Sequence, residues 1–275
     1  MKIKLTSLIA FLCLIFSITA KAGFEEGKSA FDIGDFATAK QELLPLADKG
    51  NPAAQNILGF MYAKGEGVAH DAKQAVYWFQ KAAEQGYVQA QHNLGLMYGD
   101  GDGVAHDAKQ AAYWYQKAAD QGHAPAQYNL GQMYREGDGV THDAKQAAYW
   151  FQKAADQGVA DAQNNLGMSY ANGAGVAHNA KKAVYWLKKA ADQGYALAQY
   201  NLGVKYANGE GVAHNAKKAV YWYQKAADQG VALAQLSLGV MYGKGEGVAY
   251  DAMQMVYWIQ KAADQGNAEA IALLR

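Results

Sequence analysis

Apolar residues recur along this chain at the spacing of an α-helix, in short segments separated by glycine-rich turns. From residue 51 onward each segment of about 36 residues holds two such patterns. The apolar or small positions of the first segment follow offsets of three and four residues, which places them on one face of each helix. In the first helix they are Ala54, Ile57, Leu58, Met61 and Tyr62, and in the second Ala75, Trp78, Phe79, Ala82 and Ala83.

Turn and capping residues mark where these helices begin and end. Gly65 and Gly67 separate the two helices, because glycine adopts a positive φ at little steric cost. Asp71 is placed to accept a hydrogen bond from the first turn of the second helix. Gly86 is placed just after that helix as its C′ residue. The residues equivalent to Asp71 are Asp107, Asp143, Asn179, Asn215 and Asp251.

The pattern repeats without a gap, and this repetition defines the fold class. Six full units cover 51–266, namely 51–86, 87–122, 123–158, 159–194, 195–230 and 231–266. Such a helix pair cannot bury its apolar face alone, and stacking of neighbours buries it. The sequence therefore predicts an all-α solenoid of helix-turn-helix repeats. A diverged capping unit is expected over 23–50, and a partial repeat forming a short cap helix over 267–275.

Glycine also recurs in the middle of the first helix of every unit, where it is unfavourable by about 1 kcal/mol relative to alanine. Its persistence predicts that another helix crosses closely at these points. The positions are Gly59, Gly95, Gly131, Gly167, Gly203 and Gly239.

The repeat resembles the Sel1-like repeat, a relative of the tetratricopeptide repeat with a longer loop between its helices. The resemblance covers 51–266, and 23–50 is more similar to a tetratricopeptide unit. It implies a right-handed superhelix that serves as a protein-interaction scaffold. In the first unit the matching residues are Ala54, Leu58, Gly59, Tyr62, Gly65, Gly67, Val68, Asp71, Ala75, Trp78, Phe79, Lys81, Ala82, Ala83 and Gly86.

The N-terminus has the features of a secretory signal peptide over residues 1–22. Lys2 and Lys4 precede an apolar run from 8 to 18, and Ala20-Lys21-Ala22 forms a cleavage site. The run is too short for a membrane anchor, which needs about 20 apolar residues. Cys13 lies inside the run, whereas a lipoprotein cysteine would lie at its end. We expect a periplasmic or secreted protein that begins at Gly23 and has no membrane insertion.

Charge and motifs exclude several classes of function. Cleavage would leave 22 basic and 25 acidic residues, with no basic surface suited to nucleic acid. The remaining serines are Ser29, Ser169 and Ser237, and none begins the Ser-x-x-Lys motif of serine β-lactamases. No phosphate-binding, nucleotide-binding or zinc-protease motif occurs. The sequence therefore predicts no enzyme activity, no catalytic residue, no metal and no cofactor.

Two further patterns repeat with the units. A histidine precedes the second helix in five units, at His70, His106, His142, His178 and His214, and Tyr250 replaces it in the sixth. Neighbouring units are offset by about 8–10 Å, so two such histidines cannot share a zinc ion at the usual 2.0–2.1 Å. Tyr77-Trp78 and its five copies could stack on sugars, but Trp78 falls on the core face. Tyr77 lies off that face.

Variation between units marks a candidate binding surface on the first helix, opposite its core face. Residues four apart on a helix are surface neighbours, and these variable pairs are aromatic, amide or apolar, types enriched at interfaces. Either they bind a partner or the curvature of the solenoid buries them between adjacent helices. The variable positions are Asn56, Phe60, His92, Leu96, Tyr128, Gln132, Asn164, Met168, Tyr200, Val204, Leu236 and Val240. The residues expected to bind a partner are Phe60, His92, Leu96, Tyr128, Gln132, Met168, Tyr200 and Val204.

The interpretation is therefore an exported scaffold that binds a protein partner on the concave face formed by the first helices. The alternative is a cell-wall or β-lactam-like ligand-binding module with marginal hydrolase activity, as the resemblance implies for a cysteine-rich secreted branch. This chain departs from that branch because cleavage would remove Cys13, its one cysteine. A third possibility is a purely structural spacer in an envelope assembly.

Overall fold

The computed structural model describes residues 21–274, and the regular secondary structure in this range is helical throughout. This confirms the all-α fold. The predicted signal peptide lies outside the described residues except for Lys21 and Ala22, which are helical, as are the residues that follow to 32. The helices that follow are α2 (Phe36–Asp48), α3 (Pro52–Lys64), α4 (Ala72–Glu84), α5 (Val88–Asp100), α6 (Ala108–Asp120), α7 (Ala124–Glu136), α8 (Ala144–Asp156), α9 (Ala160–Asn172), α10 (Ala180–Asp192), α11 (Ala196–Asn208), α12 (Ala216–Asp228), α13 (Ala232–Lys244), α14 (Ala252–Asp264) and α15 (Ala268–Leu273).

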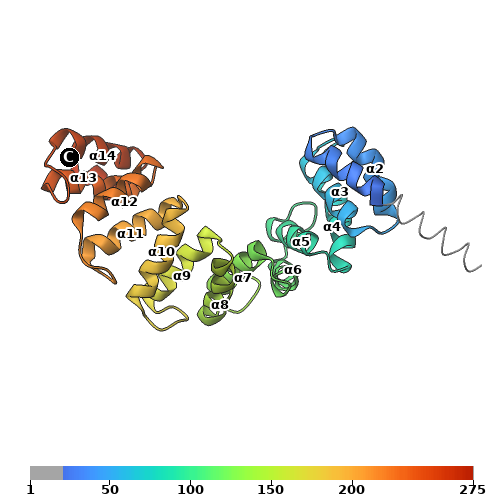
Figure 1. Cartoon of the computed structure of the whole chain (residues 1–275), viewed down its shortest axis with the longest axis horizontal. Helices are drawn as coiled ribbons and strands as arrows, with labels where there is room; N and C mark the ends of the chain where they lie inside the picture. The colour runs from blue at the N-terminus through green and yellow to red at the C-terminus, as the bar shows by residue number, and fades with distance from the viewer. Residues whose placement is uncertain (1–20, 275) are drawn as a thin grey trace, which may run out of the picture. The chain divides into compact units, whose positions relative to one another are not determined.

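Each repeat is a hairpin of two helices. The first helix of each repeat, called helix A, is α3, α5, α7, α9, α11 or α13, and the second, helix B, is α4, α6, α8, α10, α12 or α14 (Figure 1). Helix A packs against helix B of its own repeat, as α3 does against α4, and helix B packs against the next helix A, as α4 does against α5. This tandem packing of hairpins is that of a helical repeat solenoid.

The chain divides into two compact units, with the boundary inside α7. The first unit runs to Ala126 and includes Asp138–Thr141, and the second comprises Gln127–Gly137 and the chain from His142. Each unit is considered by itself below. Between residues 21 and 274 there is no helix with the length and apolar character needed to cross a membrane.

The capping residues act as the sequence predicts. Asp71 accepts a hydrogen bond from the backbone N–H of Gln74 at 3.1 Å, and Asn179 accepts one from Lys182 N–H at 2.9 Å. Gly86 follows Gln85, the C-cap residue of α4, and has a φ of 88°. These caps fix the same helix boundaries in every repeat whose caps are described.

The mid-helix glycines mark close crossings, as expected. A Cβ atom at Gly95 would lie 2.6 Å from a ring carbon of Tyr115, so α6 crosses α5 at this glycine. The loop glycines form the predicted turn and also make a close contact with the preceding repeat, which the sequence analysis did not predict. Gly103 has φ of 71°, and a Cβ there would overlap the backbone carbonyl of Ala72 at the start of the preceding helix B. The loop therefore packs on the neighbouring repeat.

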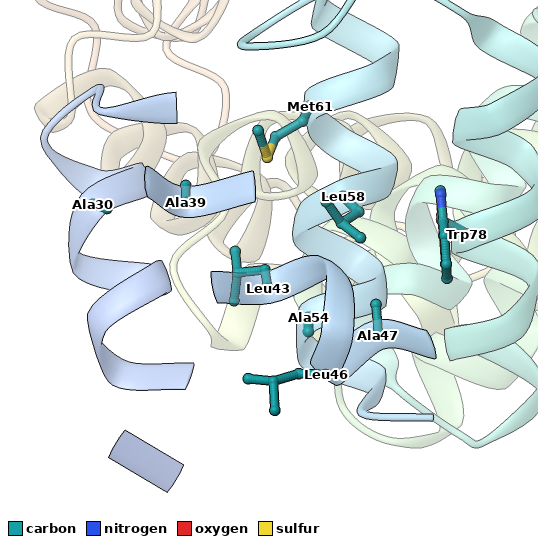
Figure 2. Packing of buried hydrophobic residues seen from close by; sticks show 9 residues of the cluster. All are labelled: Ala30, Ala39, Leu43, Leu46, Ala47, Ala54, Leu58, Met61 and Trp78. Atoms are coloured by element: carbon teal, nitrogen blue, oxygen red, sulfur yellow. The ribbon is translucent and has the colours of Figure 1, made fainter. Parts of the chain in front are cut away.

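Each core cluster joins adjacent repeats. Figure 2 shows the cluster at the N-terminal end, which combines side chains from the first helix, α2, α3 and α4. Trp78 supplies the contribution of α4 to this cluster. Farther along, Trp222 of α12 packs with Val184 and Leu187 of α10. The tryptophans are thus core residues, as predicted. Trp78 and Trp222 each pack in a core cluster that combines their own repeat with the preceding repeat.

Buried glutamines add a polar link at the same repeat junctions. Gln91 on α5 is buried, and its Nε2 donates to the carbonyl of Ala83 at the end of α4 at 3.1 Å. Its Oε1 accepts from Nε2 of Gln121, the C-cap residue just after α6, at 2.8 Å. Both bonds recur at Gln55, Gln163, Gln199 and Gln235. The sequence repeats these glutamines in all six units, but the prediction assigned them no role.

Candidate partner-binding site

The variable positions of helix A, named here the helix A strip, form two rows that differ in burial. The inner row faces the neighbouring helices and is half-buried or buried, as at Asn164 and Leu236. In the outer row Phe60 is 37% and Leu96 36% exposed, and the other four residues are half-buried. The inner row comprises Asn56, His92, Tyr128, Asn164, Tyr200 and Leu236. The outer row comprises Phe60, Leu96, Gln132, Met168, Val204 and Val240.

Aromatic side chains of the inner row pack against helix B of their own repeat. The rings of Tyr200 and Tyr223 have centroids 5.9 Å apart, and those of His92 and Tyr115 lie 5.7 Å apart. Tyr128 packs against Phe151 at 6.1 Å in the same way. These side chains therefore have packing partners on helix B, and the inner row contributes to stability.

Burial also affects the ionisation of the inner row. Desolvation, with a smaller contribution from His123, lowers the pKa of His92 to about 4. The His123 ring lies 4.9 Å away, and burial lowers its pKa as well. Burial raises the pKa of Tyr128 and of Tyr200 above the usual value for a phenol. At neutral pH these side chains are therefore uncharged packing groups.

Amide side chains of the strip connect successive A helices. Asn93 on α5 donates from Nδ2 to Oδ1 of Asn56 on α3 at 3.1 Å. Asn201 on α11 donates to Asn164 on α9 in the same way, at 3.0 Å. Gln132 of the outer row accepts from Nδ2 of Asn165 on α9 at 3.0 Å. These bonds fix the spacing of the A helices, and the exposed residues of the strip are Phe60 and Leu96.

A cavity of about 270 Å³ opens between α3 and α5 in the first unit. Its apolar wall includes Phe60 and Leu96 of the outer row together with Phe79 of helix B. Charged side chains stand at its rim, namely Lys64, Asp100 and Asp102.

A second cavity, of about 290 Å³, opens in the last repeats between α11 and α13. Its wall includes Tyr200, Leu236 and Val240 of the strip. Its charged residues are Lys244, Glu246 and Glu269, again one lysine and two carboxylates. The two cavities thus share a position on helix A, an apolar wall and the same rim composition. Sequence variation pointed to the strip, but it gave no sign of where the strip is hollowed.

The repeated histidines lie on the loop edge and have a capping role. His106, His142 and His214 place Nδ1 2.7–2.8 Å from a carbonyl oxygen in the last turn of helix A in their repeats. Such carbonyls have no partner within the helix, so the histidine closes the helix end. Within residues 21–274 no group of three or more His, Cys, Asp or Glu side chains is arranged to hold a metal ion.

The tyrosines that precede the tryptophans lie on the outer surface of helix B. Tyr77 is 45% exposed and Tyr221 53% exposed, whereas Trp78 is buried. A lysine one turn later lies over each of these rings, as Lys81 does at 4.5 Å from the Tyr77 centroid. Part of each ring face is therefore occupied by an ammonium group, which leaves less of it for stacking on a sugar.

Helical hairpins packed in tandem define a helical repeat solenoid. The Sel1 repeat family matches six consecutive segments, over residues 52–87, 88–123, 124–159, 160–195, 196–231 and 232–267. The chain belongs to the Sel1 repeat family. Proteins of this family are generally protein-interaction scaffolds.

Solved structures of relatives agree with this assignment. A protective antigen present in uropathogenic Escherichia coli strains, with an SLR fold, is 38% identical, with a TM-score of 0.86 over 91% of this chain. This chain spans only 55% of that antigen's length. A Sel1 repeat protein from Oxalobacter formigenes is 34% identical, with a TM-score of 0.78 over 87% of this chain and 96% of its own. A search of curated proteins found no match.

Proposed function

We propose that this protein is an exported protein-interaction scaffold that binds its partner along the outer row of the helix A strip. The observation that carries the proposal is the pair of similar cavities on the strip, one between α3 and α5 and one between α11 and α13. Both have an apolar wall built from variable residues on a framework of repeated ones. A scaffold that recognises one partner needs this combination of fixed architecture and variable contact residues.

The cavities also suggest what the partner presents. An apolar wall with about 270–290 Å³ of space accommodates a large apolar or aromatic side chain. Each rim carries one lysine and two carboxylates, for example Lys64 with Asp100 and Asp102. Complementary charge favours a basic residue beside the inserted side chain. We expect a partner segment in which apolar anchors are flanked by lysine or arginine.

Export rests on the N-terminal sequence, which has the charged, apolar and small-residue regions of a signal peptide. This pattern supports a location in the periplasm or outside the cell.

The ligand-hydrolysing alternative receives no comparable support. Ser237 lines the cavity between α11 and α13 together with Tyr200 and Tyr223. Burial raises the pKa of both phenols, so both stay protonated at neutral pH and cannot take the proton of Ser237. Nucleophilic catalysis needs an adjacent base for that proton, and the geometry around Ser237 favours packing.

The test is affinity purification of the partner from an envelope extract with the tagged protein as bait. Leu96→Glu places a charge at the mouth of the first cavity, and we expect it to remove the partner from the eluate. Tyr113→Glu is the matched control, because Tyr113 is 50% exposed on the outer face of α6 and lies outside the strip. Circular dichroism would show that both variants are folded. Retention of the same partner by Leu96→Glu would refute the proposal.

A further inference from the structure

Two of the six repeats differ from the others in charge. Repeats 159–194 and 195–230 each contain four lysines and two acidic residues, a net charge of +2, whereas the other four repeats range from 0 to −2. All but one of these lysines lie on the two B helices, α10 and α12. They are Lys181, Lys182, Lys188 and Lys189 on α10 and Lys217, Lys218 and Lys225 on α12, named here the lysine face.

The added charge arises from two kinds of change between repeats. Lys182 and Lys218 occupy a position that is glutamine in the other four repeats. Lys188 lies six residues after Lys182, at a position that is glutamine in the other five repeats. The N-cap residue is Asn179 or Asn215 in these repeats and aspartate in the other four. Both changes make the same surface more positive.

The asparagine caps show that this change is not required for folding. Asn179 and Asn215 accept hydrogen bonds at 2.9 Å from the backbone N–H groups of Lys182 and Lys218. Aspartate makes the same bond elsewhere, and as a negative group it favours a helix N-terminus. Helix stability gives no reason to remove the carboxylate here, and its removal leaves Lys182 and Lys218 without a neutralising neighbour.

The lysine face is exposed, and aromatic rings hold its ammonium groups in place. All seven lysines are exposed to solvent. Lys189 lies 4.9 Å from the ring centroid of Tyr185, and Lys225 lies 5.2 Å from that of Tyr221. Lys182 and Lys218 contact Tyr170 and Tyr206 of helix A, at 5.1 and 5.2 Å. Such contacts position a cation without neutralising it.

One of the seven lysines has a carboxylate partner within the described part of the chain. Lys188 pairs with Asp192 at 2.5 Å. The other six have no ion pair among residues 21–274. A surface with this much uncompensated charge is complementary to an anionic partner.

The two helices are joined through the core and at their C-terminal ends. Trp222 of α12 lies in one core cluster with Val184 and Leu187 of α10, and Gln229, which follows α12, donates from Nε2 to the carbonyl of Gly194 at 3.0 Å. Lys181 and Lys189 are eight residues apart on α10, about 12 Å along the helix axis. The lysines of one helix therefore span about as much as three to four residues of extended chain, at about 3.4 Å each.

The lysine face ends at the neighbouring B helices, α8 and α14, which carry fewer lysines. On α8 the positions equivalent to Lys182 and Lys188 are Gln146 and Gln152, and that helix begins at an aspartate. On α14 the first lysine position is Met253 and the N-cap is Asp251. A long polyanion or a flat anionic membrane would extend onto these neutral or acidic neighbours, whereas a short acidic segment would not.

We propose that the lysine face binds a short acidic protein segment, rich in aspartate and glutamate. The tyrosine rings are partly covered by ammonium groups, which favours carboxylates over sugars as the bound groups. The lysine face lies on helix B, so this interaction is separate from the helix A strip, and each proposal can fail without the other.

The test is fluorescence anisotropy of a fluorescein-labelled dodecaglutamate peptide titrated with the full protein at low ionic strength. The triple variant K182Q/K188Q/K218Q introduces the glutamines that other repeats carry at the equivalent positions, so we expect it to fold like the wild-type protein. We expect it to bind about tenfold more weakly, since each exposed lysine contributes a fraction of the binding energy. N179D/N215D retains the caps and should also weaken binding. Added salt should weaken binding by the wild-type protein.

The matched control is K73Q/K109Q/K117Q, which removes three lysines from the outer faces of α4 and α6 in the near-neutral repeats. It should change the affinity less than twofold. An equal loss in both triple variants, or no binding by the wild-type protein, would overturn the proposal. Phosphatidylglycerol vesicles give a further comparison in a sedimentation assay. Vesicle binding that depends on the same lysines and matches the peptide in strength would assign the face to a lipid surface and overturn the proposal.

Discussion

Gln193 donates a hydrogen bond from its Nε2 to Oε1 of Gln163, which lies 2.8 Å away and thirty residues earlier in the chain. Gln163 is buried, and its own Nε2 donates to the carbonyl of Ala155 at the end of the preceding helix B at 3.1 Å. One side chain thus connects the helix B before it to the helix B after it. Buried amides are stable only when both ends are bonded, so this arrangement fixes the register of neighbouring repeats.

We predict that Gln163→Leu lowers the free energy of unfolding by about 2–3 kcal/mol, because it leaves the Ala155 carbonyl and the Gln193 amide without their partner. The matched variant Gln193→Leu removes one bond at an exposed position and should lower it by less than about 1 kcal/mol. Urea denaturation of both variants measures the difference. Equal effects would show that the buried glutamine is not the element that joins the repeats.

The sequence predicted the helices, caps and close crossings because each depends on residues near one another in the chain. Asp71 caps a helix that begins at the next residue, and Gly95 repeats at the point where two helices of one hairpin cross. The glutamine links were missed because they join residues thirty positions apart. Their signal, an unvaried polar residue on a helix in every unit, was present in the sequence.

Truncation of one core tryptophan should destabilise the chain locally. Trp222→Ala removes a ring that packs on Val184 and Leu187, and core truncations of this kind lower the free energy of unfolding by about 3–5 kcal/mol. Because each repeat contacts only its neighbours, hydrogen exchange should rise first in α10, α11 and α12. A uniform rise over all described helices would contradict the repeat-by-repeat packing of the core.

Stability should decrease in mild acid because of His92. Its pKa is lowered to about 4 in the folded protein, below the usual 6.5, so the unfolded chain binds more protons between these values. The stability is complete above about pH 6.5 and falls as the pH is lowered toward 4, by about 2–3 kcal/mol from this residue. His123 changes stability in the same direction, because its pKa is also lowered.

His92→Asn tests this directly, since asparagine occupies the equivalent position at Asn56 and Asn164. The variant should lose most of the decrease in stability between pH 6.5 and 4. Urea denaturation at several pH values gives the profile. A wild-type profile that is flat over this range, or a decrease that His92→Asn leaves unchanged, would refute the assignment.

The candidate site was predictable in outline only. Variation between repeats identified positions such as Leu96 and Tyr200 without distinguishing them. The structure separates them, because Tyr200 packs on Tyr223 whereas Leu96 borders an open cavity. That difference depends on the packing of adjacent A helices, which no single repeat encodes.

Export makes a prediction about the N-terminus of the mature protein. Protein recovered from the periplasm or the medium should begin at Gly23, because cleavage is expected after Ala22. N-terminal sequencing measures this. A chain that keeps Lys2, or one that carries lipid on Cys13, would contradict the signal-peptide assignment.

The most direct test of the binding groove is photo-crosslinking in the producing cell. A photoreactive amino acid replaces Leu96 or Val240, one for each cavity of the helix A strip, and in control proteins it replaces Tyr113 or Tyr257 on the outer faces of α6 and α14. We predict that both strip positions crosslink to the same protein and that neither control position does. Crosslinks from Tyr113 and Tyr257 with none from Leu96 and Val240 would place the partner on helix B and contradict the proposed function.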